Sequence, residues 1–196
     1  MTTVYTPESR VWVTSDLHLN HDKNFIWQAR GFNSVQEMNK TIIKNLQELV
    51  HAEDELYICG DVILGEIDLD LLKQIPGRVH VILGNHDTDA REQVYKDLGW
   101  SVSFGERIKY VDGKNKASLL LTHYPTLTTN PRDKIEQWVY NVSGHTHSQY
   151  KWDSYQPFIY NVGCDANDCR PVALSFIVNF IQDKSCYQGC PIHILI

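Results

Sequence analysis

The sequence contains no apolar run long enough to cross a membrane. Its first residues, Met1 to Tyr5, lack the charged and apolar regions of a secretory signal peptide. We therefore expect a cytoplasmic protein that makes no membrane contact. The 18 Lys and Arg residues are outnumbered by 24 Asp and Glu residues, which gives a formal net charge of -6. This balance argues against an extended cationic surface for nucleic acid and favours a small or locally held substrate.

The cysteine pattern of a structural zinc site or a disulfide framework is also missing. The five cysteines are an odd number, and Cys59 lies in an apolar run, so we expect reduced thiols. Cys186 and Cys190, with Cys164 and Cys169 upstream, are the alternative candidates for a second metal site. Their spacing is not the usual two-residue knuckle, so the sequence favours free thiols.

Internal repeats, low-complexity segments and linkers are absent, and residues 1–196 are therefore expected to form one domain. The first half alternates short apolar runs with segments of helical periodicity, which is typical of an α/β fold. One helix has a capping box from Ser34 to Glu37. We predict strands at 11–14, 56–59 and 79–83 and helices at 35–49, 69–75 and 90–98.

The second half is predicted to form a second sheet. Two apolar runs flank Asp112-Gly113-Lys114-Asn115, a pattern typical of a hairpin. We predict its strands at 108–111 and 118–122, later strands at 139–142, 158–162 and 172–180, and a short helix at 131–138. The tail from 182 to 196 fits an edge strand, a partner contact or a disordered end equally well.

Five short polar segments follow the predicted strands and contain metal-ligand side chains. Carboxylate, imidazole and amide oxygen suit Mn, Fe and Zn ions, and none of the segments offers a thiolate. Each segment alone is weak evidence for a metal site, since Asp and Asn also cap helices and turns. Their conjunction in one chain predicts a reactive metal site: Asp16-Leu17-His18, Gly60-Asp61, Gly84-Asn85-His86-Asp87, His123 and Gly144-His145-Thr146-His147.

In their order and residue pattern these segments resemble the motifs of the calcineurin-like metallophosphoesterase superfamily. The resemblance extends from Trp12 to His147, and the stretches 161–165 and 170–172 look like the ending of small bacterial and phage members. It implies an α/β fold in the form of a four-layer sandwich: two facing mixed β-sheets, flanked by helices, with the metal site on strand-end loops.

The same resemblance implies two divalent metal ions, with Mn²⁺ favoured and Fe, Zn, Ni or Mg as alternatives. Asp61 is expected to bridge the ions. Two ions about 3.5 to 4 Å apart can clamp the attacking and leaving oxygens of a phosphoryl displacement and make hydroxide available near neutral pH. The expected ligands are Asp16, His18 and His147 for one ion and Asn85, His123 and His145 for the other.

The resemblance assigns His86 as the catalytic residue that stabilises the transition state and protonates the leaving oxygen, a task suited to a side chain that titrates near neutrality. Several relatives orient this histidine with an aspartate, but the matching position here is Leu64. Three other carboxylates are candidates for this task, and the sequence does not choose among them: Asp22, Asp87 and Asp165.

Substrate-binding residues are expected just after the first metal pair. His21, Asn24 and Arg30 match a pattern in small relatives and are close enough in sequence to face the same rim. By contrast, His51 and His193 lie outside every motif and are expected to be solvated, while His80 alternates with apolar neighbours and is expected to pack in its strand.

The expected activity is that of an enzyme, a metal-dependent phosphoric ester hydrolase. A phosphodiesterase acting on a small nucleotide-like or other phosphorylated substrate is favoured, because the chain lacks the long inserts with which nuclease or protein phosphatase relatives hold large partners. The alternatives are a phosphomonoesterase, a nuclease on short strands, and a non-catalytic metal-binding scaffold. The physiological substrate, the native metal and the oligomeric state stay open.

Overall fold

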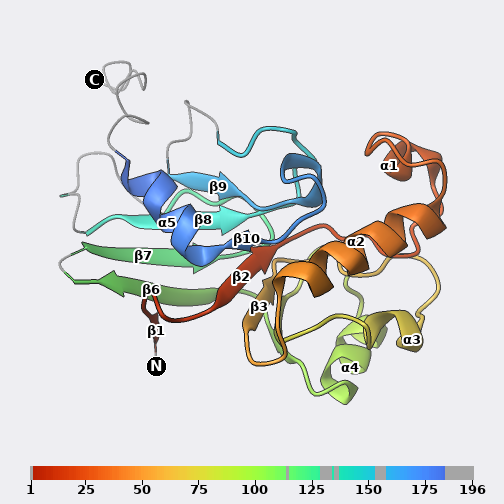
Figure 1. The fold of residues 1–196 in the computed structure, drawn as a ribbon, viewed down its shortest axis with the longest axis horizontal. Coiled ribbons are helices and arrows are strands. Elements are labelled where there is room, and N and C mark those ends of the chain that lie inside the picture. Colours follow the sequence, from red (N-terminus) through yellow and green to blue (C-terminus); the bar gives the residue numbers. More distant parts are fainter. Residues whose placement is uncertain (1, 114, 129–133, 135–136, 153–157, 184–196) are drawn as a thin grey trace.

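The computed structural model describes residues 2–113, 115–128, 134, 137–152 and 158–183. Two five-stranded mixed sheets face each other, and helices flank them (Figure 1). This arrangement confirms the predicted α/β fold. Within the described ranges, no helix has the length and apolar character needed to cross a bilayer.

The first sheet is built mainly from the amino-terminal half. Its order is β10-β2-β3-β4-β5, in which β2 to β5 are parallel and β10 runs antiparallel to β2. The predicted strands of this half are confirmed, and β5 extends the sheet. The bounds are β2 Val11–Thr14, β3 Glu55–Ile58, β4 Arg78–Ile82, β5 Ser101–Ser103 and β10 Val172–Ala173.

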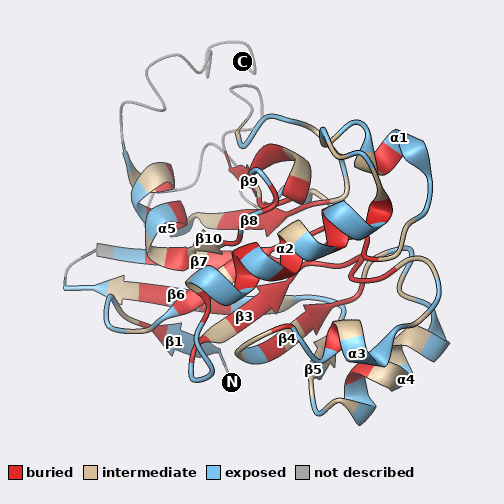
Figure 2. Ribbon diagram, turned by 45° about the vertical axis from the view of Figure 1, so that its right-hand side comes forward, coloured by how far each residue is buried: buried red, intermediate tan, exposed pale blue. Residues whose placement is uncertain are grey.

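Three helices supply side chains to the core on one side of this sheet: α2 (Val35–Leu49), α3 (Leu69–Leu72) and α4 (Asp89–Asp97). Ser34 caps helix α2 as predicted, because its Oγ accepts a hydrogen bond from the Glu37 N–H at 3.1 Å. The reciprocal contact of a capping box differs, since the Glu37 carboxylate accepts from the Asn33 N–H at 2.9 Å and not from that of Ser34. Its buried residues recur at helical spacing and face the strands, while its other face is exposed (Figure 2).

The second sheet has the order β1-β6-β7-β8-β9. Strands β6 and β7 form the predicted hairpin, and Ile108 pairs with Leu119. Side chains of both sheets meet in one buried cluster that includes Val13, Tyr57, Leu119 and Val142. The bounds are β1 Thr3–Tyr5, β6 Glu106–Asp112, β7 Asn115–Leu121, β8 Val139–Ser143 and β9 Ile159–Asn161.

The strand predicted at 172–180 is wrong. Only β10 is extended there, and the chain continues as helix α5 (Leu174–Gln182). The buried residues are Leu174, Ile177, Val178 and Ile181, a spacing of three, four and seven that places them on one helical face. A continuous apolar run does not distinguish the two states by itself, since β-branched residues also suit a strand. The predicted helix at 131–138 falls mostly on residues outside the described ranges, and the tail beyond 183 lies outside them.

Candidate metal centre

The predicted ligands lie at one rim of the molecule, because each follows the carboxyl end of a strand. Asp16 follows β2, Asp61 follows β3 and Asn85 follows β4, while His123 follows β7 and His145 follows β8. Parallel neighbours end at the same edge, so the loops of β2, β3 and β4 converge. Five predicted ligands have positive φ angles, a strained conformation typical of functional sites: Asp16 (55°), His18 (51°), Asp61 (57°), His145 (69°) and His147 (49°).

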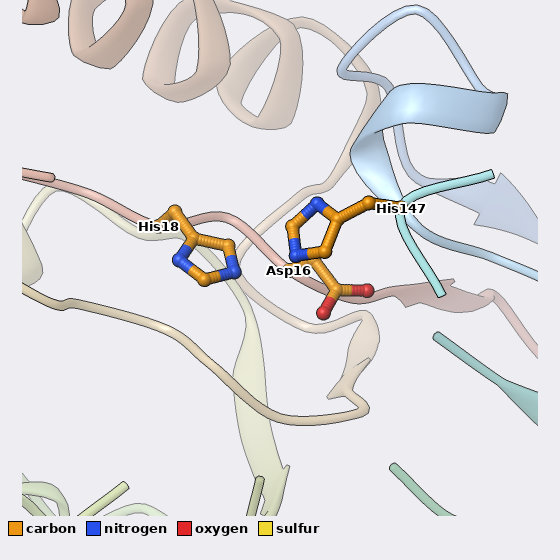
Figure 3. A group of neighbouring side chains, drawn as sticks. All are labelled: Asp16, His18 and His147. Atoms are coloured by element: carbon orange, nitrogen blue, oxygen red, sulfur yellow. The ribbon is translucent and has the colours of Figure 1, made fainter. Parts of the chain in front are cut away.

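Asp16, His18 and His147 form the first group of ligands. Their ligand atoms lie within 4.8 Å of one another, and the three side chains point toward a common centre (Figure 3). Asp16 is also held by the backbone N–H of His145, which donates to its two carboxylate oxygens at 3.2 and 3.0 Å. The structure therefore brings together the three residues expected around one ion.

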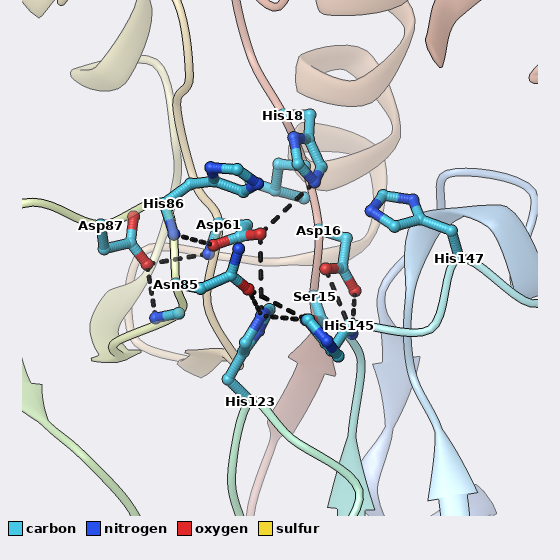
Figure 4. Close-up of polar contacts among 12 residues, drawn as sticks. Ser15, Asp16, His18, Asp61, Asn85, His86, Asp87, His123, His145 and His147 are labelled. Carbon is cyan, nitrogen blue, oxygen red and sulfur yellow. Dashed lines mark hydrogen bonds and ion pairs between the residues drawn. The ribbon is translucent and has the colours of Figure 1, made fainter. Parts of the chain in front are cut away.

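Asn85, His123 and His145 form the second group (Figure 4). Asn85 Oδ1 lies 2.8 Å from His123 Nε2 and 3.0 Å from His145 Nδ1, and the two nitrogens are 3.1 Å apart. Since His123 Nδ1 lies 2.9 Å from the Cys59 carbonyl, which can only accept, Nδ1 carries the proton and Nε2 presents a lone pair. Three ligand atoms about 3 Å apart are spaced as they are around one ion with bonds of about 2.1 Å.

Asp61 lies between the two groups. Its Oδ2 is 3.6 Å from Nε2 of His18 in the first group and 3.6 Å from Nε2 of His123 in the second. Its carboxylate forms another close group of potential ligands with Asp16 and His123. This is the position that a bridging carboxylate requires.

The burial of these groups fits bound cations. Asp16 and Asp61 are at most 2% exposed, and burial of an anion without a positive partner is costly. Both ring nitrogens of the buried His18 lack a hydrogen-bond partner. Burial lowers the pKa of His18 to about 2 and raises the pKa of Asp16. A neutral imidazole with a free lone pair is the form that binds a metal, and a cation beside Asp16 would offset its desolvation.

His86 lies at the edge of this cluster, and its ring packs edge-on against His18 with centroids 5.8 Å apart (Figure 4). Its backbone N–H donates to Asp61 Oδ1 at 3.0 Å. Asp87 does not orient it: the Asp87 carboxylate accepts from the N–H groups of Asp61 and Gly84, both at 2.8 Å, and from Tyr95 Oη, so it anchors the loop. Across the described residues no hydrogen bond reaches the His86 imidazole.

The three predicted substrate-binding residues have different surroundings. His21 stacks on His18 with ring centroids 5.3 Å apart, so it borders the first group as expected. Asn24 is exposed at the start of α1 (Asn24–Trp27), and no described contact joins its side chain to the cluster.

Arg30 does not face the rim. Its side chain is only 2% exposed, and its donors are used by protein groups. The Nη atoms donate to the carbonyls of Leu17 at 3.1 Å and Asp16 at 2.8 Å, and Nε and Nη2 donate to the Asp165 carboxylate. The fifth N–H, on Nη1, faces Met38 Sδ at 3.6 Å. With all five donors engaged, this placement favours a structural task over the predicted substrate contact.

Two further residues lie against the ligand groups. Asp165, in the 3₁₀ turn Cys164–Ala166, was a candidate for orienting His86, but its carboxylate lies 2.9 Å from His147 Nδ1 instead. Tyr124 is half exposed, and its ring centroid lies 4.4 Å from that of His145. Asp165 falls within the stretch that resembles small family members, but spacing alone does not indicate which histidine it meets.

The remaining histidines behave as expected where the structure describes them. His51 is exposed, and His80 packs in β4 with its ring stacked on Tyr57 at a centroid distance of 4.5 Å. His80 also contacts Glu55 and Ser101 of the neighbouring strands. Neither His51 nor His80 contacts either group of ligands.

We expect Gly84→Ala to disturb the metal centre. A Cβ at Gly84 would lie 2.8 Å from Asp61 N and still closer to Asp61 Oδ1, so the carboxylate has to shift. Such overpacking typically costs about 1–3 kcal/mol of stability. Chemical denaturation and Mn²⁺ binding by the variant measure both effects. Gly105→Ala is the matched control, because its nearest contact would be an ordinary 3.4 Å; equal metal binding in the two variants contradicts the expectation.

Fold and ligand cluster together define an α/β protein that can hold divalent ions on the loops at one rim. The chain belongs to the calcineurin-like phosphoesterase superfamily, whose domain model matches residues 10–180. Members of this superfamily are generally metal-dependent phosphoesterases, and the clustered ligands agree with that chemistry.

Relatives of similar length occur in an archaeon and in phages. The chain is 31% identical over 185 residues to an uncharacterized protein of Methanocaldococcus jannaschii, covering 88% of this chain and 92% of the relative. It is 31% identical over 201 residues to the gene 66 protein of Mycobacterium phage D29, covering 89% of this chain and 98% of the relative. A crystal structure of a protein of unknown function from Aquifex aeolicus shares the fold, with a TM-score of 0.65 and 23% identity. The match covers 88% of this chain and 100% of that protein's chain.

Proposed function

We propose that this protein is a two-metal phosphodiesterase that hydrolyses a small phosphorylated molecule. The observation that carries the proposal is the arrangement around Asp61: two groups of three ligands lie on either side of one buried carboxylate, and His86 lies beside them. Two divalent ions bound there would supply hydroxide near neutral pH and neutralise the charge that develops on the phosphoryl oxygens.

The chain's own residues have separate tasks in this proposal. His86 is exposed and close to the cluster, so its imidazole can donate a proton to the leaving oxygen. His21 lies beside His18 and can hydrogen-bond a non-bridging phosphate oxygen. Asn85 provides a neutral oxygen, which limits the negative charge that an anionic substrate meets.

The arginines around the site support a diester more than a monoester. Among the residues that the structure describes, two arginines approach the ligand loops, and both are engaged: Arg30 with Asp165 and backbone carbonyls, and Arg91 with the carbonyls of His86 and Leu64. A diester carries one negative charge, whereas a monoester carries up to two and gains more from a free cationic donor. The engaged arginines therefore favour the diester.

Exposed aromatic side chains border the cluster on two sides. Phe25 is 65% exposed and packs edge-on against His21, and Tyr124 is 50% exposed beside His145. Aromatic faces of this kind stack on planar rings. They support a substrate that carries a ring, such as a cyclic or linear nucleotide diester.

Refilling metal-stripped protein with Mn²⁺, Ni²⁺, Zn²⁺ or Mg²⁺ and measuring hydrolysis of two chromogenic esters tests the proposal. We expect metal-dependent turnover of bis-p-nitrophenyl phosphate that exceeds turnover of p-nitrophenyl phosphate. Faster monoester hydrolysis would identify a phosphatase instead. The absence of turnover with every metal, despite bound ions, would favour the scaffold, and strongly salt-dependent cleavage of short strands would favour the nuclease.

A further inference from the structure

Asp165 and Arg30 form a largely buried ion pair beside the first group of ligands, with side-chain exposures of 13% and 2%. Asp165 Oδ2 accepts from Arg30 Nη2 at 2.9 Å, and Oδ1 accepts from Arg30 Nε at 3.1 Å, a bidentate contact. The same Oδ2 lies 2.9 Å from His147 Nδ1. One carboxylate therefore connects an arginine of the amino-terminal third with a ligand from the loop after β8.

The arginine extends this contact to the loop that carries the other two ligands. Its Nη atoms donate to the carbonyls of Asp16 and Leu17, the residues on either side of the peptide bond that leads toward His18. Asp16 and His18 both have positive φ angles, so their loop is strained and requires support from its surroundings. The Arg30–Asp165 pair thus contacts the segments of all three ligands in the first group.

Hydrogen bonds of its neighbours Cys164 and Asn167 hold the turn that carries Asp165 in place. The Cys164 N–H donates to the Ser15 carbonyl at 3.0 Å, which joins the turn to the end of β2. Asn167 Nδ2 donates to the carbonyls of Asn161 and Gly163, at 3.1 and 3.0 Å. These anchors lie at the ends of β2 and β9, which belong to the two different sheets, so the turn that carries Asp165 is held from both sides.

We propose that Asp165 is a positioning residue for His147 and that the Arg30–Asp165 pair sets the geometry of one of the two ion sites, the one formed by Asp16, His18 and His147. A proton on Nδ1 directed at Asp165 leaves Nε2 of His147 free to bind a metal. The second group has no contact with the pair in the described residues, since His123 is oriented by the Cys59 carbonyl. The pair therefore acts on one ion selectively. This inference rests on the proposed two-metal site.

Asp165→Asn tests the inference because an amide has a single acceptor oxygen. It cannot accept from both Nε and Nη2 of Arg30 and from His147 as the carboxylate does. Equilibrium dialysis of the metal-stripped protein against Mn²⁺ measures the number of bound ions and the affinity of each. We expect the wild type to bind two ions and the variant to bind one unchanged, while the other binds about 10–100-fold more weakly.

The identity of the weakened site follows from a second substitution. Asn85→Ala removes a ligand of the other group, so the double variant Asp165→Asn/Asn85→Ala should retain no tight ion. If both substitutions affected the same site, the double variant would still hold one ion tightly, and the inference would be overturned.

Asp54→Asn is the matched control for general loss of stability. Asp54 is a buried aspartate that is likewise paired with an arginine, with Arg10 Nε at 2.7 Å, but it precedes β3 and lies at the opposite end of the strand from Asp61. It should lower the melting temperature and leave both ions bound. Equal weakening of one ion by Asp54→Asn and Asp165→Asn would contradict the inference.

Two further outcomes are distinguishable. Should Asp165→Asn fail to fold, Arg30→Lys keeps the positive charge but cannot reproduce the contacts to Asp165 and both carbonyls, and it should weaken the same ion. Binding of two ions at wild-type affinity by Asp165→Asn overturns this inference alone. Failure of the wild type to bind two ions overturns the proposed function.

Discussion

Asp61→Asn is expected to abolish metal-dependent hydrolysis. Asp61 lies between the two groups of ligands, 3.6 Å from His18 Nε2 and 3.6 Å from His123 Nε2, and its Oδ1 accepts from the His86 N–H. Replacing the carboxylate by an amide removes the negative charge that both ions would share. We expect Mn²⁺ affinity to fall by more than the about 10–100-fold that loss of an outer-shell partner typically costs, and turnover to fall with it.

Metal titration followed by turnover of bis-p-nitrophenyl phosphate measures this effect. Asp68→Asn is the control, because Asp68 caps helix α3 away from the cluster by accepting from the Leu71 N–H. It should cost about 1 kcal/mol of stability or less and leave metal binding intact. Retention of two tightly bound ions by Asp61→Asn would show that this carboxylate does not bridge them.

His86→Ala is expected to lower turnover without changing the number of bound ions. The imidazole lies beside the cluster and outside both groups of ligands, so its loss should remove proton donation and leave the metal sites complete. General acids typically contribute about 10²–10⁴-fold. That full effect is expected for a dinucleotide, whose leaving group is a sugar alkoxide that needs a proton.

The dependence on the leaving group separates this role from a structural one. p-Nitrophenolate is stable as an anion, so bis-p-nitrophenyl phosphate should lose much less activity in His86→Ala than the dinucleotide does. His51→Ala, which changes an exposed histidine outside the motifs, should alter neither substrate's turnover. An equal loss on both substrates would contradict the assignment of His86 as the proton donor.

The family resemblance supplied the list of candidate ligands, and their convergence at one rim was predictable because each follows the end of a strand. A buried strand can be recognised from a short apolar run, and parallel neighbours present the residues that follow them at one rim. Asp16, Asp61 and Asn85 all follow such runs, and the structure brings them together with the histidines from the second sheet. The predicted groups around each ion agree with the convergence of the side chains.

The orientation of side chains outside these strand ends was not predictable. Arg30 matches a motif close to the first ligand pair, yet its guanidinium turns inward to Asp165, a residue 135 positions away in the sequence. Such a contact depends on where the turn after β9 lies in three dimensions, which sequence spacing does not encode. Helix α5 presents the same difficulty at a smaller scale, since its apolar run suits a strand until the packing partners are known.

Hydrolysis is expected to require two ions at this rim. The most direct test titrates metal-stripped protein with Mn²⁺ and records, at each concentration, both the number of ions bound per chain and the rate of bis-p-nitrophenyl phosphate hydrolysis. We expect the rate to stay low while the first ion binds and to rise in proportion to occupancy of the second. Full turnover with one ion per chain, or turnover that persists after exhaustive chelation, would contradict it.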